Sequence, residues 1–228
     1  MTSVNGVTFH GFRLQTTGGI RSVAQVNRAR DERMKPELLR AFEAFQGLLQ
    51  RFGLASDQFL SMGSYNCRCT SAGVRLSDHS SGEALDISGL RFTGTPPAGA
   101  VGQHVLIHNF ASAAHIGLIR RMNAALRLVF PQVLDYHLSD HRDHFHVDMN
   151  QGRGFAIRSK STIRFVQEVL NSLGSSLRIS GVLDAPTQAA LRTAAGLPST
   201  IDLARNNNAL RAAEQALFQL VASGRRVN

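Results

Sequence analysis

Two short segments of the chain contain side chains that could together bind a divalent metal ion. Residues 77–86 (SDHSSGEALD) offer an imidazole from His79 and a carboxylate from Asp86, and residues 141–146 (HRDHFH) offer three further imidazoles and another carboxylate. Imidazole nitrogens and carboxylate oxygens are common ligands of zinc, and a catalytic zinc ion keeps three protein ligands and leaves a fourth position for water. The two segments therefore predict a metal-dependent hydrolase.

The spacing within each segment predicts how these side chains reach one site. His79 and Asp86 are seven residues apart with Gly82 between them, which suits a loop that carries the histidine and a strand that carries the aspartate. Residues 144–149 are expected to form another strand, in which alternate side chains lie on one face. The side chains that would share this face are those of His144, His146 and Asp148. Two roles are open for Asp148, a hydrogen bond to a ligand or a cap for the strand.

The apolar pattern around these segments predicts the elements that position them. Helical spacing of apolar residues favours a helix over residues 20–52, which Gly53 ends. Strands are expected over residues 58–65 and 85–90, and a Gly/Pro-rich loop over residues 92–103. A further helix is predicted over residues 104–129. It would carry the remaining histidines of the region in structural positions, and these are His104, His108 and His115.

A polar, glycine-rich hinge at residues 151–154 separates this part from a helical one. The first predicted helix after it is closed by Gly174. The second begins at Asp184 with Pro186 in its first turn, and the third covers residues 201–222. The predicted fold class is therefore α+β, a small antiparallel sheet with flanking helices that holds a zinc site, followed by a three-helix module. We predict a catalytic domain at residues 1–152 and a helical domain at residues 155–228.

Composition limits the classes of partner. The 228 residues carry a formal net charge of +9, of which residues 151–228 contribute +6 from 10 basic and 4 acidic side chains. Such a chain attracts polyanions, and an anionic cell-wall polymer and nucleic acid are both candidates. Two Tyr and no Trp argue against nucleic acid, because single strands stack on aromatic side chains. No apolar run is long enough to span a bilayer.

A family resemblance rests on three motifs. The pattern SxHxxGxAxD stands at residues 77–86, HRDHFHVDM at 141–149, and SYNCR at 64–68. Together they resemble the extensin-like C-terminal family, within the wider group of lysostaphin, D-Ala-D-Ala peptidases and hedgehog, over roughly residues 30–150. Residues 160–198 are similar to the three-helix peptidoglycan-binding module. The resemblance implies a zinc peptidase of bacterial peptidoglycan whose ligands would be His79, Asp86 and His146.

The resemblance leaves two residues as the base that accepts a proton from the attacking water. Asp143 stands where D-Ala-D-Ala peptidases place an acidic base, and His144 stands where lysostaphin and its relatives place a catalytic histidine. We favour His144, because a strand would put it on the ligand face, and Asp143 could then orient a histidine. The residues expected to contact substrate are Arg68, His141 and Ser77, with Arg68 also near the developing oxyanion.

Cysteine usage departs from the family. Cys67 and Cys69 are too close in sequence for a good disulfide, and the cysteine that relatives carry in a later helix is missing from residues 120–130. This fits folding in a reducing cytoplasm. The first 19 residues lack a secretory signal, so we expect synthesis in the cytoplasm and action in the periplasm or cell wall after non-classical delivery, by a secretion system or by phage lysis.

The function expected from these features is a zinc-dependent peptidoglycan hydrolase that cleaves an amide bond in stem peptides or cross-links. It would act as a phage-type lysin or as an exported antibacterial effector, as a monomer without a transmembrane segment. Its partners would be bacterial peptidoglycan and, for an effector, an immunity protein or secretion machinery, but not nucleic acid. The alternative function is a zinc-containing cell-wall-binding protein that does not catalyse.

Overall fold

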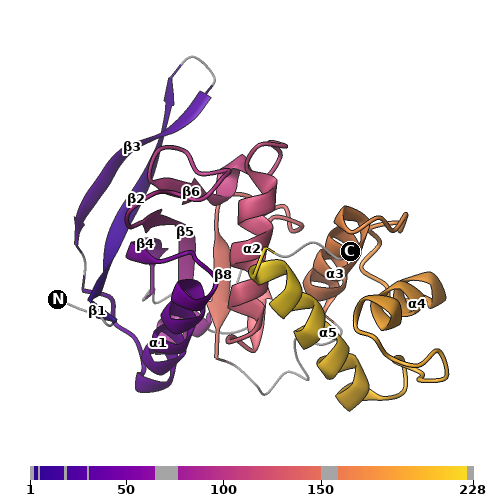
Figure 1. Cartoon of the computed structure of the whole chain (residues 1–228). Coiled ribbons are helices and arrows are strands. Elements are labelled where there is room, and N and C mark those ends of the chain that lie inside the picture. Colours follow the sequence, from indigo (N-terminus) through magenta and orange to yellow (C-terminus); the bar gives the residue numbers. More distant parts are fainter. Residues whose placement is uncertain are drawn as a thin grey trace.

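A computed structural model describes residues 3–4, 6–17, 20–29, 31–64, 77–149 and 159–224 of the chain. Figure 1 shows a sheet with helices packed against it and the C-terminal helices at one side. The strands are β1 (Ser3–Val4), β2 (Val7–Thr17), β3 (Ile20–Ala29), β4 (Ser56–Gly63), β5 (Ala84–Phe92), β6 (His104–Leu106), β7 (Gln132–Leu134) and β8 (Phe145–Asp148). The helices are α1 (Pro36–Arg51), α2 (Ile116–Arg127), α3 (Lys160–Ser172), α4 (Ala185–Ala194) and α5 (Asn207–Ala222), with short 3-10 helices η1 (Asp78–Ser81) and η2 (Ile107–Asn109).

The α+β class is confirmed, but the small antiparallel sheet is a wrong prediction. The described strands form one eight-stranded sheet in the order β1-β2-β4-β5-β8-β7, with β3 paired to β2 and β6 paired to β5. The pairing of β2 with β4 is parallel, so the sheet is mixed. A parallel pair needs a crossover connection, and β3 and α1 supply it between β2 and β4.

Two predicted helices are shorter than expected because their first residues pair in the sheet. Within 20–52 the helix is confined to α1, which starts where Pro36 occupies its first turn, and residues 20–29 pair with β2 as a strand. Within 104–129 the helix is confined to α2, because residues 104–106 pair with β5. Gly89 permits this pairing, since a Cβ atom there would lie 2.1 Å from the Val105 carbonyl oxygen. His104 therefore lies on a strand.

The other elements largely match the predictions. β4, β5 and β8 fall at the predicted strands, and three helices follow residue 159. The last of these begins at Asn207 rather than at 201, because the Asn206 side chain accepts a hydrogen bond from the Ala209 N–H and caps the helix there. The predicted domain boundary, at residues 152–155, lies outside the described residues.

A cluster of phenylalanine rings packs α1 onto the sheet. The rings of Phe42 and Phe45 on α1 contact Phe59 on β4 and Phe130 after α2, with centroid separations of 5.0–6.1 Å, and Phe9 on β2 joins them. All five side chains are buried. This core fixes β4, and with it β5, the strand that carries Asp86.

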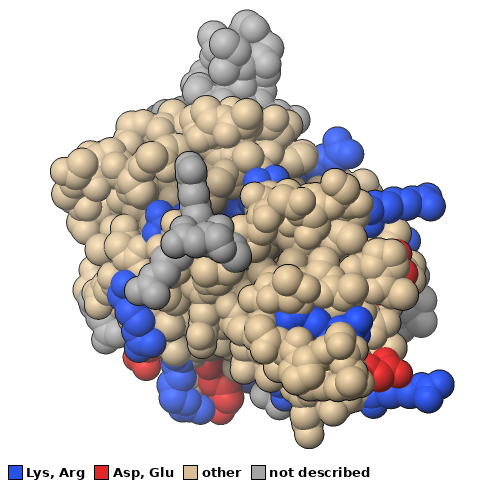
Figure 2. Space-filling model, turned by 45° about the vertical axis from the view of Figure 1, so that its right-hand side comes forward, with Lys and Arg blue, Asp and Glu red and all other residues tan. Residues whose placement is uncertain are grey.

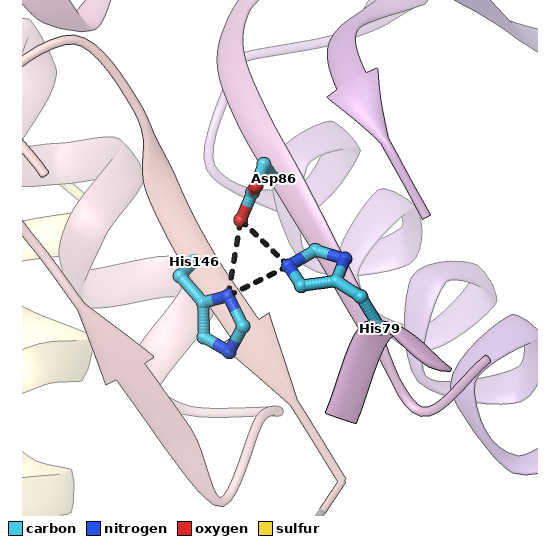
Figure 3. Close-up of side chains that lie close together, drawn as sticks. All are labelled: His79, Asp86 and His146. Atoms are coloured by element: carbon cyan, nitrogen blue, oxygen red, sulfur yellow. Dashed lines mark hydrogen bonds and ion pairs between the residues drawn. The ribbon is translucent and has the colours of Figure 1, made fainter. Parts of the chain in front are cut away.

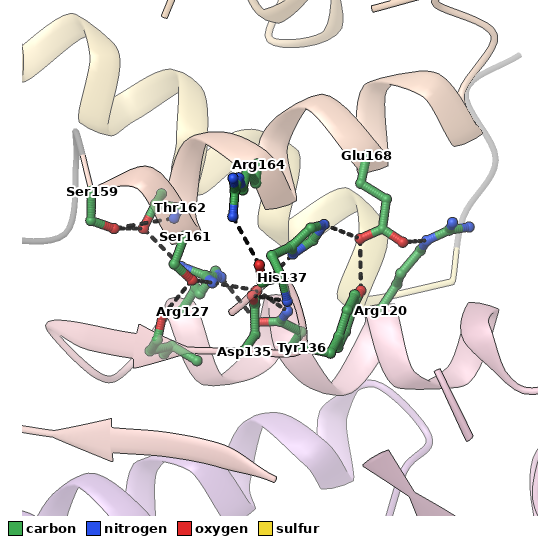
Figure 4. Close-up of polar contacts among 12 residues, drawn as sticks. Arg120, Arg127, Asp135, Tyr136, His137, Ser159, Ser161, Thr162, Arg164 and Glu168 are labelled. Atoms are coloured by element: carbon green, nitrogen blue, oxygen red, sulfur yellow. Dashed lines mark hydrogen bonds and ion pairs between the residues drawn. The ribbon is translucent and has the colours of Figure 1, made fainter. Parts of the chain in front are cut away.

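The C-terminal helices are joined to the rest of the molecule by buried polar contacts of α2 (Figure 4). The Arg127 guanidinium donates to Asp135 Oδ2 at 2.7 Å, to Thr162 Oγ1 at 2.7 Å and to Ser161 Oγ at 3.0 Å. Its side chain is 4% exposed and that of Asp135 is fully buried. A buried ion pair thus joins α2 to the residue that follows β7, and the same Arg127 side chain bonds the start of α3.

Glu168 on α3 forms a second set of contacts in the same region (Figure 4). Its carboxylate accepts hydrogen bonds from Arg120 Nε at 2.9 Å and from the Tyr136 hydroxyl at 2.7 Å, and it lies 3.3 Å from His137 Nε2. The same helix α2 contributes Arg121, which donates to the Phe52 carbonyl at the end of α1 and to the Ala222 carbonyl at the end of α5. These carbonyls carry the negative ends of the helix dipoles.

Among the described residues, no helix combines the length and apolar character that a bilayer crossing requires.

Candidate metal centre

Three neighbouring elements bring His79, Asp86 and His146 together (Figure 3). His79 lies on η1, which begins where the Ser77 side chain accepts a hydrogen bond from the His79 N–H and ends at Gly82, whose φ of 70° is left-handed. Asp86 lies on β5 and His146 on β8, and the two are direct partners in the antiparallel register. The strand placement of Asp86 and His146 is confirmed, but His79 lies on a short 3-10 helix instead of a loop, and His144 lies one residue before β8 instead of on it.

The three ligand atoms lie at separations that suit a tetrahedral metal ion. His79 Nε2 is 3.1 Å from His146 Nδ1, His146 Nδ1 is 3.0 Å from Asp86 Oδ1, and His79 Nε2 is 3.2 Å from Asp86 Oδ1. Ligand atoms about 2.0–2.1 Å from a tetrahedral zinc ion are about 3.3 Å apart. These residues are buried or nearly so. The residues present therefore fit one small divalent cation.

Hydrogen bonds on the far side of each imidazole orient its lone pair toward the same point. His79 Nδ1 lies 2.9 Å from the Ser64 carbonyl oxygen, which can only accept, so Nδ1 carries a proton and Nε2 is the nitrogen that can face a ligand. His146 Nε2 lies 3.3 Å from Asp148 Oδ2, which favours a proton on Nε2 and a lone pair on Nδ1. Such partners are typical of histidines that bind metals. Of the two roles left open for Asp148, the structure shows the hydrogen bond to His146.

The close contact between His146 and Asp86 favours a charged pair. Burial alone lowers the pKa of His146, but hydrogen bonds to Asp148 and Asp86 outweigh it and raise the pKa to about 9. Burial alone raises the pKa of Asp86, yet its close contacts with His146 and His79 bring it well below its usual range. The resulting charged pair has its shared proton on Nδ1, the position that faces the other two ligand atoms. A divalent cation would take the place of that proton.

His144 and Asp143 lie beside this group. His144 Nδ1 is 2.8 Å from Asp143 Oδ1, and His144 Nε2 is 3.7 Å from Asp86 Oδ1. The imidazole thus contacts Asp143 through Nδ1, and its Nε2 faces the candidate metal ligands. The neighbouring His141 ring is 4.9 Å from that of His144. Burial lowers the pKa of His141, although the Asp140 carboxylate opposes it.

The remaining predicted residues are placed as follows. Ser77 caps η1 through a long 3.4 Å contact to the His79 N–H. Arg68, Cys67 and Cys69 lie outside the described residues, so their predicted roles stay predictions. Ser64, which holds His79 in place, was missed because its contribution is a main-chain carbonyl that any residue type could supply. Ser64 is the first residue of the SYNCR motif, which indicated the segment but not this role.

A second group of possible ligands lies on the other face of His146. It consists of Asp78, His146 and Asp148. Because His146 Nε2 already lies against the Asp148 carboxylate, we interpret this contact as orienting His146 rather than as a second centre.

The fold and the site define an α+β protein with a His–Asp–His group that can hold a metal ion. The family model described as extensin-like protein C-terminus matches residues 20–158. This match covers more than half of the chain, and the chain belongs to that family, as the motifs predicted. The matched region ends just before α3. No curated protein and no solved structure gives a significant match.

Proposed function

We propose that this protein is a zinc-dependent hydrolase that cleaves an amide bond in the stem peptides or cross-links of bacterial peptidoglycan. The observation that carries the proposal is the convergence of three ligand atoms within 3.2 Å of one another, with His144 Nε2 at 3.7 Å from Asp86 Oδ1. Structural sites usually fill all four positions of zinc with protein ligands, whereas three ligands and an adjacent base are typical of hydrolytic sites.

The side chains divide the chemistry among them. Zinc, when bound by His79, Asp86 and His146, would act as a Lewis acid and lower the pKa of water. His144 would accept the proton of the attacking water at Nε2 and later return it to the leaving amine. Asp143, which accepts a hydrogen bond from Nδ1 of the same ring, would keep Nε2 free of a proton and stabilise the imidazolium.

The substrate class rests on the motifs and on charge. The motifs at residues 77–86 and 141–149 resemble the extensin-like C-terminal family, a resemblance that implies a peptidase of peptidoglycan, and the net charge of +9 favours an anionic wall. On the face shown in Figure 2, Lys and Arg side chains form several separate groups, and Asp and Glu are fewer. We therefore assign wall attraction to overall charge and to the helical module, and propose that the protein acts as a lysin or an exported effector.

Digestion of purified peptidoglycan tests the function. We expect mass spectrometry to detect peptide fragments with a newly exposed amine and carboxylate, and we expect chelation of zinc to abolish them and added zinc to restore them. His79→Ala should give no products even with zinc added. His104→Ala is the matched control, because His104 lies toward the other end of β5, where it pairs with Arg91, and it should digest normally.

Two results would contradict the proposal in different ways. Digestion that persists in chelator and in His79→Ala would remove zinc from the mechanism. Zinc binding and wall binding without any new termini would instead support the alternative, a cell-wall-binding protein that does not catalyse.

A further inference from the structure

A buried carboxyl group lies behind the candidate metal centre, on a segment that the motifs do not include. Glu32 stands between β3 and α1 and is 6% exposed. Its Oε1 accepts a hydrogen bond from Ser61 Oγ at 2.7 Å, and its Oε2 accepts from the Ser64 N–H at 2.9 Å and from Ser64 Oγ at 2.8 Å. Both serines are fully buried. A buried carboxyl group with three such bonds fixes the end of β4 firmly.

Ser64 connects this carboxyl group to the metal centre. Its N–H and hydroxyl are held by Glu32, and its carbonyl oxygen lies 2.9 Å from His79 Nδ1. Ser61 strengthens the same turn, because its Oγ accepts a hydrogen bond from the Gly63 N–H at 2.9 Å. The path from Glu32 to the ligand nitrogen of His79 therefore runs through one residue, and each contact along it is short and buried.

The carbonyl of Ser64 determines which nitrogen of His79 carries hydrogen. A carbonyl oxygen can only accept, so it selects the tautomer with hydrogen on Nδ1 and leaves the Nε2 lone pair for a ligand bond. If Ser64 moved away, the ring could carry its proton on Nε2 instead, and it would lose its fixed orientation as well. Partners of this kind change metal affinity by about 10–100-fold when they are removed.

We infer that Glu32 is a positioning residue for the metal centre, which holds the Ser64 carbonyl so that His79 presents Nε2 to a divalent cation. This inference rests on the proposed function, because it assumes that the centre binds zinc. Glu32 lies outside residues 77–86 and 141–146, which supply the candidate ligands. Its positioning role explains why a carboxyl group is buried beside two serines at the end of β4.

The inference is tested by measuring zinc affinity in competition with a chromophoric chelator. We expect Glu32→Ala to weaken the zinc Kd about 10-fold, because the hydrogen bonds from Ser61 and Ser64 to the carboxyl group are lost. Glu32→Gln should restore most of the affinity, since its amide oxygen can still accept both bonds from Ser64. Glu43→Ala, on the exposed face of α1, is the matched control and should bind zinc as the wild type does.

A second measurement separates positioning from a purely structural role. Long-range proton–nitrogen NMR of the zinc-free protein should show hydrogen on Nδ1 of His79 in the wild type and a mixture of both tautomers in Glu32→Ala. Loss of thermal stability with unchanged zinc affinity and an unchanged tautomer would overturn the inference. If Glu32→Ala does not fold, Ser64→Ala, which removes only the hydroxyl contact, should still weaken zinc affinity measurably, and wild-type affinity there would also overturn it.

The outcome for the wild type distinguishes this inference from the proposed function. If the wild type binds no zinc, the proposed function and with it the role of Glu32 are both wrong. If the wild type binds zinc and cleaves peptidoglycan while Glu32→Ala binds zinc equally well, only the positioning role is wrong.

Discussion

Replacing His144 with alanine is expected to lower the rate of peptidoglycan cleavage by about 10²–10⁴-fold while zinc stays bound. The variant removes the imidazole whose Nε2 lies 3.7 Å from Asp86 Oδ1, and it leaves the three ligand atoms in place. Cleavage would be followed by release of soluble fragments and zinc by competition with a chelator. This variant is therefore expected to lose activity but keep its zinc, whereas His79→Ala is expected to lose both.

Asp143→Ala decides between the two residues considered as the base. If Asp143 only orients His144, its removal should reduce the rate less than His144→Ala does. A larger loss for Asp143→Ala, with His144→Ala nearly active, would assign the base to Asp143. Loss of zinc from His144→Ala would show that His144 is a ligand and would contradict its assignment as the base.

Arg127→Ala is expected to destabilise the protein by about 3–5 kcal/mol, because it leaves a buried carboxylate without its partner. Asp135 is fully buried and lies 2.7 Å from the Arg127 guanidinium, which also bonds Ser161 and Thr162 on α3 (Figure 4). Chemical denaturation would give the change in the free energy of unfolding.

Arg205→Ala is the control for this variant. Arg205 also pairs with an aspartate, at 3.5 Å from Asp202, but its side chain is 90% exposed, and exposed pairs contribute at most about 1 kcal/mol. Equal destabilisation by the two substitutions would show that burial of the Arg127 pair has no special effect.

The same ion pair predicts a pH dependence. Burial by itself raises the pKa of Asp135, but Arg127 and hydrogen bonds from His137 and Asn123 outweigh it and bring the pKa below the usual range. A lowered folded-state pKa stabilises the protein fully above the unfolded value of about 3.9, and this contribution is lost as pH falls through the folded-state pKa. The difference in unfolding free energy between the wild type and Arg127→Ala should therefore shrink in acid. A difference that stays constant from pH 6 to pH 3 would contradict this.

The three candidate ligands could be predicted because their motifs resemble those of a known family, and the local pattern within each segment agrees with that set. His79 and Asp86 share one short segment, and the alternation of a strand places His146 and Asp148 on one face. Glu32 could not be predicted, because it acts through the main chain of Ser64, 32 residues away. The strand character of residues 20–29 was missed for a related reason, since it depends on pairing with β2 rather than on the apolar pattern of the segment.

The contacts made by α2 have a practical consequence for protein engineering. Arg120, Arg121 and Arg127 all belong to this helix, and they bond Glu168 and Ser161 on α3 and the end of α5. A chimera that grafts residues 159–224 onto another protein would carry a buried Glu168 away from the arginine that neutralises it. Exchange of the C-terminal helices between relatives should therefore transfer the matching surface of α2 as well, or replace Glu168 with an apolar side chain.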